Sequence, residues 1–397
     1  MLGVKGVYMV MDYMLSEEEK MMIETARTIA VEKMKPVREH YDEKEEFPWD
    51  IVKEFAQADL CGVYIPEEYG GFGKGIMGLV LVVEELCKVD GAIALSLAAT
   101  ALGTLPILIA GNEEQKKKYL PDIASGKKLA AFGLTEANAG SDATGMITTA
   151  VKDGNYYILN GTKCFITNGG DAETYTIFAK TNPARGARGI SCFIMEKGIP
   201  GFEFGKKEKK MGIKASSTRE LVFNNCRVHK DQLLGKEGHG LMIAQATLDN
   251  SRPGVAAQAL GIAAGALDEA VAYARKRVQF GQAIASFQGI QHMLADMATE
   301  VEAARALLYA SARMIDSGTE KRTSKESAMA KLFCSEVAMK VTTNAVQIFG
   351  GYGYSREYPV EKMMRDAKIT TLYEGTSQIQ KNEIALNLIK EFAAKSK

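Results

Sequence analysis

The spacing of apolar residues changes twice along the chain and predicts three segments of different structure. From residue 12 to about 122 apolar side chains recur at helical spacing, and helix-start signals accompany three of the runs: Ser16 with Glu19, Pro48, and Asn112 with Gln115. From about 129 to 235, short runs rich in β-branched and aromatic residues predict strands. Helical spacing returns after Gly240, over residues 241–278, 288–317, 322–349 and 378–393. The predicted order is helical, then β, then helical.

Local signals refine these segments. Asn160-Gly161 is the strongest hairpin signal in the chain, and Pro183 to Gly189 predicts a further turn. The uncharged stretch from Gly91 to Asn112 is long enough to span a bilayer, but polar residues and a proline interrupt it. We expect a buried helix there, capped by Asp90 at its start and broken near Gly103.

Composition narrows the class of protein. The 397 residues are 46% apolar and 25% charged, which is typical of a globular chain of two or three domains. Lys plus Arg equals Asp plus Glu at 49 each, so no net charge draws the chain to nucleic acid or to an anionic membrane. Six Cys without a CxxC pair and four scattered His argue against a disulfide framework or a metal site.

The N-terminal segment lacks the apolar core and cleavage site of a signal peptide, so we expect a cytoplasmic protein, with Met11 as an alternative start. Common catalytic motifs are missing as well: the chain has no Walker A, GxSxG or HExxH sequence. Gly73 to Gly78 fits GxGxxG by spacing, but no βαβ pattern surrounds it, which disfavours a nicotinamide site.

Four segments, in chain order, resemble the acyl-CoA dehydrogenase family of flavoproteins. They are FGLTEANAGSD (132–142), KCFITNGG (163–170), LDNSRPGVAAQALG with ARKRVQFG (248–261 and 274–281), and the long run from Gln347 to Gln380. The amino-acid sequence around 132–145 and 347–376 is most similar to that of bacterial short-chain (butyryl-CoA) dehydrogenases. The resemblance covers the chain from about Met11 to Leu386 and matches the helical, β, helical order.

The resemblance implies a multi-domain α+β fold and a homotetramer. An N-terminal helical domain is expected over 12–122, a middle β-barrel-like domain over 123–237 and a C-terminal four-helix bundle over 238–397. The middle domain would bind the flavin and the acyl-CoA. The bundle would carry FAD contacts, the oligomer interface and the catalytic carboxylate.

The resemblance also implies non-covalent FAD. Positions on the middle domain that match flavin contacts are Phe132, Leu134, Thr135, Phe165, Ile166 and Thr167. Arg277, Gln279 and Phe280 match a segment that reaches the FAD pyrophosphate of a neighbouring subunit, where an Arg suits a bidentate hold on phosphate. Gln347, Gly351, Thr376 and Gln378 match positions that complete the adenosine and pyrophosphate site.

Glu374 matches the family's catalytic base. Removing a proton from the weakly acidic Cα of an acyl thioester, while a hydride leaves Cβ for flavin N5, requires a base and a polarised carbonyl. The neighbours of Glu374 are uncharged, so burial is expected to raise its pKa toward the working pH. Family geometry implies that the Glu374 backbone N–H and a flavin hydroxyl polarise the thioester oxygen.

Other family members place the base or the substrate contacts differently. The base of isovaleryl-CoA dehydrogenase-like members matches Ser251, which cannot serve, and Asp90 aligns near the base of cyclic-diene-forming members. Residues 91–95 lack the Arg that glutaryl-CoA dehydrogenases carry, which disfavours a dicarboxylic acyl group. For the substrate, Ser141, Asp249 and Arg252 match CoA contacts, while Tyr373 and Gly375 adjoin the acyl group. Asp249 and Arg252 stand three residues apart, so pairing with each other is an alternative to binding CoA.

These inferences predict an FAD-dependent short-chain acyl-CoA dehydrogenase of fatty acid β-oxidation that passes electrons to an electron-transferring flavoprotein. Two alternatives stay open: an enoyl-CoA or arylacrylyl-CoA reductase running in the reverse direction, and a dehydrogenase of branched, alicyclic or aromatic acyl groups. Zero net charge and the presence of Glu374 disfavour a nucleic-acid-associated or non-enzymatic member. No metal, nucleic-acid or membrane partner is expected.

Overall fold

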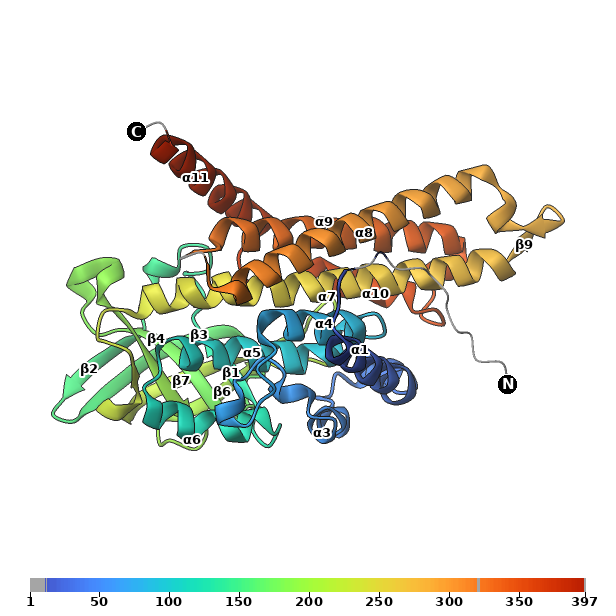
Figure 1. Cartoon of the computed structure of the whole chain (residues 1–397). Helices are drawn as coiled ribbons and strands as arrows, with labels where there is room; N and C mark the ends of the chain where they lie inside the picture. Colours follow the sequence, from blue (N-terminus) through green and yellow to red (C-terminus); the bar gives the residue numbers. More distant parts are fainter. Residues whose placement is uncertain (1–10, 12, 320–321, 396–397) are drawn as a thin grey trace.

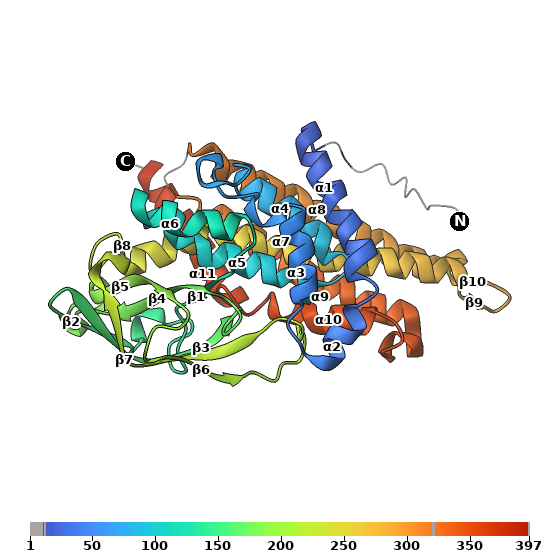
Figure 2. The same ribbon diagram turned by 90° about the horizontal axis from the view of Figure 1, so that it is seen from below.

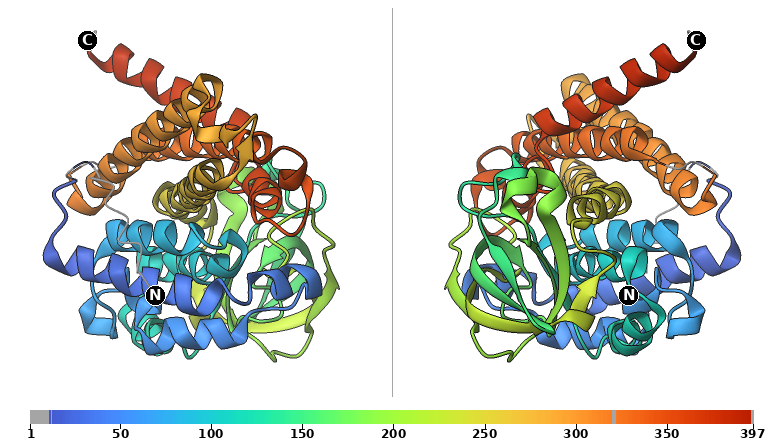
Figure 3. Two further views of the ribbon diagram at one scale, coloured as in Figure 1. Left: turned by 90° about the vertical axis from the view of Figure 1, so that its right-hand side faces the viewer. Right: turned by 90° about the vertical axis from the view of Figure 1, so that its left-hand side faces the viewer.

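The computed structural model describes residue 11, residues 13–319 and residues 322–395. Its elements follow the order predicted from the sequence. The long C-terminal helices form one layer, and the N-terminal helices and the β-domain lie side by side against it (Figure 1, Figure 3). Residues 1–10, on which the prediction about Met11 depends, lie outside the described part.

Short and medium helices build the N-terminal part, seen from below in Figure 2. Both predicted capping boxes are confirmed: Ser16 exchanges hydrogen bonds with Glu19 (2.7 and 3.2 Å), and Asn112 exchanges them with Gln115 (2.8 and 3.0 Å). The helix predicted after Pro48 begins at the next residue. The helices are α1 (Glu17–Ile29), α2 (Arg38–Lys44), α3 (Trp49–Gln57), α4 (Gly75–Cys87), α5 (Gly91–Ala110) and α6 (Glu113–Ala124).

The expected break in α5 near Gly103 is wrong, because the helix continues through that residue and through Pro106. Gly103 serves close packing instead: an added Cβ would lie 2.4 Å from the backbone nitrogen of Ala131. By length and composition α5 and the later helix α7 (Gly240–Lys276) resemble membrane spans, yet most of each is buried inside the protein. The prediction of a buried core helix is therefore confirmed for α5.

An eight-stranded sheet forms the middle part, with the strand order β6-β7-β3-β2-β4-β5-β8 and β1 added in parallel to β4. The predicted hairpin at Asn160-Gly161 is wrong. Both residues lie within one strand, where Gly161 (φ +145°) sits at a bulge opposite β7, and the chain turns earlier, at Gly154-Asn155. The turn over Pro183 to Gly189 is confirmed between β4 and β5. The strands are β1 (Ala130–Gly133), β2 (Thr149–Asp153), β3 (Tyr156–Thr167), β4 (Thr174–Lys180), β5 (Ile190–Glu196), β6 (Phe202–Lys207), β7 (Thr218–His229) and β8 (Leu233–Leu234).

The C-terminal helices end close to the predicted residues. Between α7 and α8 a small hairpin, β9 (Val278–Gln279) with β10 (Gln282–Ala283), extends from one end of the bundle, and α11 projects from the other (Figure 1). Tyr273 near the end of α7 stacks on Phe349 at the end of α9, with ring centroids 4.0 Å apart. The helices are α7, α8 (Gln288–Ser317), α9 (Ser324–Phe349), α10 (Val360–Ile369) and α11 (Ser377–Lys395).

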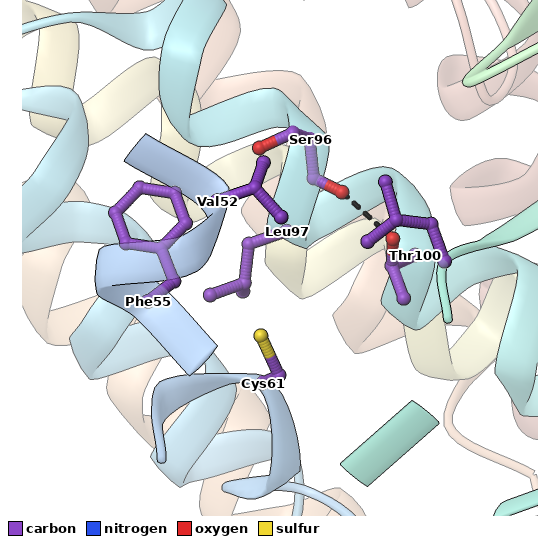
Figure 4. A pocket seen from close by; sticks show the side chains of 7 residues that line it. Val52, Phe55, Cys61, Ser96, Leu97 and Thr100 are labelled. Carbon is purple, nitrogen blue, oxygen red and sulfur yellow. Dashed lines mark hydrogen bonds between the residues drawn. The ribbon is translucent and has the colours of Figure 1, made fainter. Parts of the chain in front are cut away.

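A small cavity lies between α3 and α5 in the N-terminal part (Figure 4). Its lining is mainly apolar, from Val52, Phe55 and Leu97 among others, and the Thr100 hydroxyl beside it donates to the Ser96 carbonyl. Its volume of about 10 Å³ accommodates at most a single water molecule. This cavity is therefore no substrate site.

Candidate active site

Glu374 lies on the turn that joins α10 to α11. Its backbone is left-handed (φ +50°), and Gly375 follows with φ +96°. A left-handed conformation is costly for a residue with a Cβ and often marks a functional position. The Ser251 hydroxyl, from α7, donates to the Glu374 carboxylate. Burial raises the pKa of Glu374, although Ser251, Arg252 and Lys331 act in the opposite direction.

Two side chains that the sequence analysis did not single out fix this turn. The Gln380 amide of α11 donates to the carbonyl oxygens of Glu374 and Gly375, both at 3.0 Å. The Lys331 ammonium of α9 donates to the Gly375 carbonyl at 2.7 Å. Thr376, just before α11, accepts from the Ile379 backbone N–H through its hydroxyl at 3.3 Å. The carboxylate is therefore presented from a firmly held backbone.

Helix α7 carries two of the three predicted CoA contacts, Asp249 and Arg252. Arg252 lies 3.6 Å from Asp249, and the other Asp249 oxygen accepts from the Ser324 hydroxyl at 2.6 Å. Both charged side chains are buried. The pairing that spacing allowed is therefore present in the structure, while the positive charge of Arg252 also acts on Glu374.

Tyr373 connects the turn to the N-terminal part. Its hydroxyl donates to the Gln258 side chain of α7, and the Gln258 amide donates to the Gly91 carbonyl at 2.9 Å. Burial raises the pKa of Tyr373 far above its ordinary value, so the hydroxyl stays protonated. This chain of hydrogen bonds links the Glu374 turn through α7 to the start of α5.

Asp90, the rival base, is committed elsewhere. One oxygen caps α5 by accepting from the backbone N–H groups of Ala92 and Ile93 at 2.8 and 2.9 Å, which confirms the predicted cap. The other oxygen lies 2.8 Å from the Lys362 ammonium, which also contacts Asp366 at 2.6 Å. Burial opposes the Lys362 charge, but the two carboxylates outweigh it and raise the pKa of Lys362.

The predicted flavin contacts form a cradle where β1 and β3 meet. Lys163 donates to the Leu134 carbonyl at 3.0 Å, and the Cys164 N–H donates to the Thr135 carbonyl at 2.9 Å. Lys163 is buried and paired with Glu136 at 2.7 Å. Phe165 has a left-handed backbone (φ +57°) and is 63% exposed, so its ring is free to cover a flat ligand. Two further predicted flavin positions lie on the same strands, Phe132 in β1 and Thr167 at the end of β3. Ser141, a predicted CoA contact, is exposed in the loop after β1.

The Ile166 side chain packs into the core of the sheet instead, with 2% exposure. Only its backbone is available to a ligand in this structure. The regular alternation of the strand is interrupted here: the pairing with β7 shifts register between Lys163 and Ile166, and the left-handed Phe165 lies within this irregularity.

The predicted phosphate and adenosine contacts form a second group at the hairpin end of the bundle. The Arg277 guanidinium lies 5.2 Å from the Tyr352 ring centroid, while Gln279, Phe280, Gln347 and Gly351 are exposed nearby. Thr376 and Gln378 are not part of this group, since they adjoin Glu374. Lys331, which contacts the Glu374 turn, stands 16 residues before Gln347 on α9, or roughly 24 Å along the helix.

The chemistry of these two groups suits the two ends of a dinucleotide. The cradle offers an exposed ring beside fixed backbone, and the space over Gly351 is open, since an added Cβ would meet nothing within 4 Å. The half-buried guanidinium of Arg277 is of a type that suits a phosphate. Figure 1 places the hairpin and the β-domain at opposite ends of one chain, so a single copy does not bring the groups together.

Comparison with known proteins covers almost the whole chain. Family models described as the N-terminal, middle and C-terminal domains of acyl-CoA dehydrogenase match residues 16–127, 131–226 and 238–389. A short-chain-specific acyl-CoA dehydrogenase from Clostridium acetobutylicum is 49% identical over 372 residues, covering 94% of this chain and 98% of the relative. Acryloyl-CoA reductase (NADH) from Anaerotignum propionicum is 50% identical over 382 residues, or 96% of each chain.

Solved structures agree. Butyryl-CoA dehydrogenase from Megasphaera elsdenii has a TM-score of 0.93 and 47% identity, with 96% of this chain and 100% of that chain covered. A chain in a structure described as the electron transferring flavoprotein of Acidaminococcus fermentans has a TM-score of 0.93 and 50% identity, covering 95% and 99%. The fold expected from the resemblance is confirmed, and the family is FAD-dependent. Because three family models match it in order and solved structures match its fold, the chain belongs to the acyl-CoA dehydrogenase family, as an oxidoreductase of the short-chain type.

Proposed function

We propose that the protein catalyses α,β-dehydrogenation of a short-chain acyl-CoA to the trans-2-enoyl-CoA, with Glu374 as the base. The observation that carries this proposal is the Glu374 carboxyl itself. It accepts from Ser251, its pKa is raised by burial, and its backbone is fixed by Lys331 and Gln380. Asp90 is tied to Lys362 and the start of α5 and so is not available for the same task.

In this reaction Glu374 takes the proton from Cα. A raised pKa makes the carboxylate a stronger base near neutral pH, which suits the weakly acidic Cα–H. The Glu374 backbone N–H polarises the thioester oxygen, while Ser141, Asp249 and Arg252 contribute to holding the CoA portion. When bound, FAD supplies the hydride acceptor, at N5, for the hydride that leaves Cβ.

A short acyl group fits the contacts around the turn. Hydrogen bonds link Tyr373 through Gln258 to Gly91 at the start of α5, so these residues leave little room for a long acyl chain beside Glu374. The start of α5, residues 91–95, is uncharged and buried, so a distal carboxylate would find no cation there. This supports butyryl-CoA or a substrate of similar size.

A homotetramer is proposed because one chain separates the two FAD groups. Large apolar side chains are exposed at both ends of the bundle: Phe280 at the hairpin tip is 94% exposed, and Ile389 on projecting α11 is 65% exposed. Large exposed apolar side chains of this kind are typical of an interface. We propose an electron-transferring flavoprotein as the redox partner and a cytoplasmic location; the Acidaminococcus fermentans structure supports the first.

A second candidate is the reverse reaction, reduction of a short enoyl-CoA. The 50% identity to an acryloyl-CoA reductase over 96% of the chain favours it specifically. The residues and the proton transfer are the same in both directions, since a catalyst lowers both barriers equally. The electron donor or acceptor sets the direction.

The test is an acyl-CoA panel assayed anaerobically by bleaching of the flavin absorbance, with wild type and Glu374→Gln side by side. We expect butyryl-CoA to bleach the wild type and not the variant. Bleaching of Glu374→Gln at the wild-type rate contradicts the proposed base. A second arm supplies crotonyl-CoA with a reduced electron-transferring flavoprotein: sustained reduction of crotonyl-CoA, while butyryl-CoA fails to reduce the oxidised flavoprotein, indicates the reductase.

A further inference from the structure

Lys331 is a fully buried lysine on the face of α9 that packs against the Glu374 turn. Its ammonium donates to the Gly375 carbonyl at 2.7 Å. Among the residues that the structure describes, no carboxylate lies within 4 Å of it, although Glu374 is close enough to influence it. A buried ammonium without an ion pair is costly, and such groups cluster at functional sites.

The charged groups around Lys331 come from three directions. The turn supplies Glu374. Helix α7 supplies Arg252, whose positive charge repels that of Lys331 and which is itself paired with Asp249. From α11 the neutral Gln380 shares the Gly375 carbonyl, and Glu383 acts on Asp249, the partner of Arg252. Burial lowers the pKa of Lys331 to about 8, with Glu374 raising it and Arg252 lowering it further. Lys331 is thus mostly protonated at neutral pH, and Glu374 is the carboxylate whose charge acts on it.

We propose that Lys331 is a positioning residue for the base: its ammonium holds the Gly375 carbonyl in the left-handed turn, and its positive charge keeps Glu374 ionised. The proposal rests on the proposed function of Glu374. Lys331 touches no reacting atom in this scheme. It acts through the backbone and the charge balance of the turn.

Two substitutions separate the hydrogen bond from the charge. Lys331→Gln keeps a neutral donor, and Lys331→Met keeps neither. Lys340→Met is the matched control, because Lys340 lies on the same helix but is exposed and paired with Glu300 at the surface. Removing a nearby opposite charge raises the pKa of a buried carboxyl by about one unit or more.

The experiment follows the Glu374 carboxyl directly in the holoenzyme, by infrared difference titration, with the band assigned through Glu374→Gln. In both Lys331 variants the titration midpoint is expected to rise by about one pH unit. The acid limb of the kcat/KM profile for butyryl-CoA should move by the same amount. At pH values below the limb, kcat/KM of the variants should therefore be about tenfold lower than that of the wild type. Lys331→Met should lower kcat further than Lys331→Gln, because it also loses the hydrogen bond.

An unchanged midpoint in a folded Lys331→Met protein overturns the proposal. So does failure of both variants to fold, because Lys331 then serves the fold alone. A shift of equal size in Lys340→Met also overturns it, as the effect is then not specific to the turn. An active Glu374→Gln enzyme instead refutes the proposed function, so the two failures are distinguishable.

Discussion

Exchanging the two candidate carboxylates for amides should separate stability from chemistry. Asp90→Asn is expected to destabilise the protein and leave flavin reduction by butyryl-CoA intact. Glu374→Gln is expected to leave stability almost unchanged and to abolish flavin reduction by butyryl-CoA. The contrast follows from the contacts: Asp90 holds the start of α5 and the Lys362 ammonium, whereas Glu374 faces Ser251 on a turn held by other groups.

The cost of Asp90→Asn can be worked out from those contacts. The amide keeps an oxygen for the Ala92 and Ile93 N–H groups, and Asn is as good a helix cap as Asp, so the cap adds almost nothing. The ion pair with Lys362 is lost, while the pair with Asp366 remains. A hydrogen bond to a charged group contributes about 1.5–3 kcal/mol to stability, so we expect Asp90→Asn to lower the free energy of unfolding by about 2–3 kcal/mol.

Glu374→Gln should change the free energy of unfolding little. The amide keeps a partner for Ser251, and because burial raises the pKa of Glu374, the ionised carboxylate itself disfavours the folded state at neutral pH. The rate of flavin reduction should fall by about two to four orders of magnitude, as is usual when a general base is removed.

Guanidinium unfolding and anaerobic stopped-flow bleaching measure the two effects on the same preparations. Asp153→Asn, at an exposed strand end, controls for the chemistry of the substitution. The reasoning is refuted if Asp90→Asn loses flavin reduction with FAD bound and unfolds like the wild type. In that case Asp90 is the base and the enzyme belongs with the members that act on cyclic substrates.

Four further outcomes are expected. The purified protein should be yellow and release FAD on denaturation; a colourless protein that FAD cannot reconstitute contradicts the site. Light scattering should show a tetramer, and an active FAD-replete monomer would remove the need for a shared site. Deleting residues 1–10, which lie outside the described part, should leave activity and the melting temperature unchanged. Lys163→Met should lower the free energy of unfolding by about 3–5 kcal/mol, because it leaves Glu136 buried without its cation. Lys152→Met, at an exposed position, should leave that free energy almost unchanged in the same unfolding assay.

Local signals in the sequence were reliable where the structure is local. The capping boxes at Ser16 and Asn112 and the cap at Asp90 need only residues within three positions, and all are present. Asn160-Gly161 failed because a distant strand decides its role: pairing with β7 turns the Gly into a bulge within β3. Gly103 failed for a similar reason, since close packing on β1 uses it without ending the helix.

The candidate site divides in the same way. Glu374 and the cradle residues were identified from motifs, because a resemblance carries residue types in order along the chain. Their supports were not, since Lys331 stands 43 positions before Glu374 and Ser251 stands 123 before it, so only the fold brings them together. A buried Lys within an apolar helical face was the one visible sign of Lys331.

The left-handed backbone at Glu374 sets stability against activity at a single position. A glycine there would adopt φ +50° without the cost of about 1–2 kcal/mol that a side chain imposes, and it would remove a carboxyl that burial disfavours. Selection for stability alone would therefore discard this glutamate. With Glu374 as the proposed base, libraries screened only for thermal tolerance should replace this residue early and lose flavin reduction by acyl-CoA.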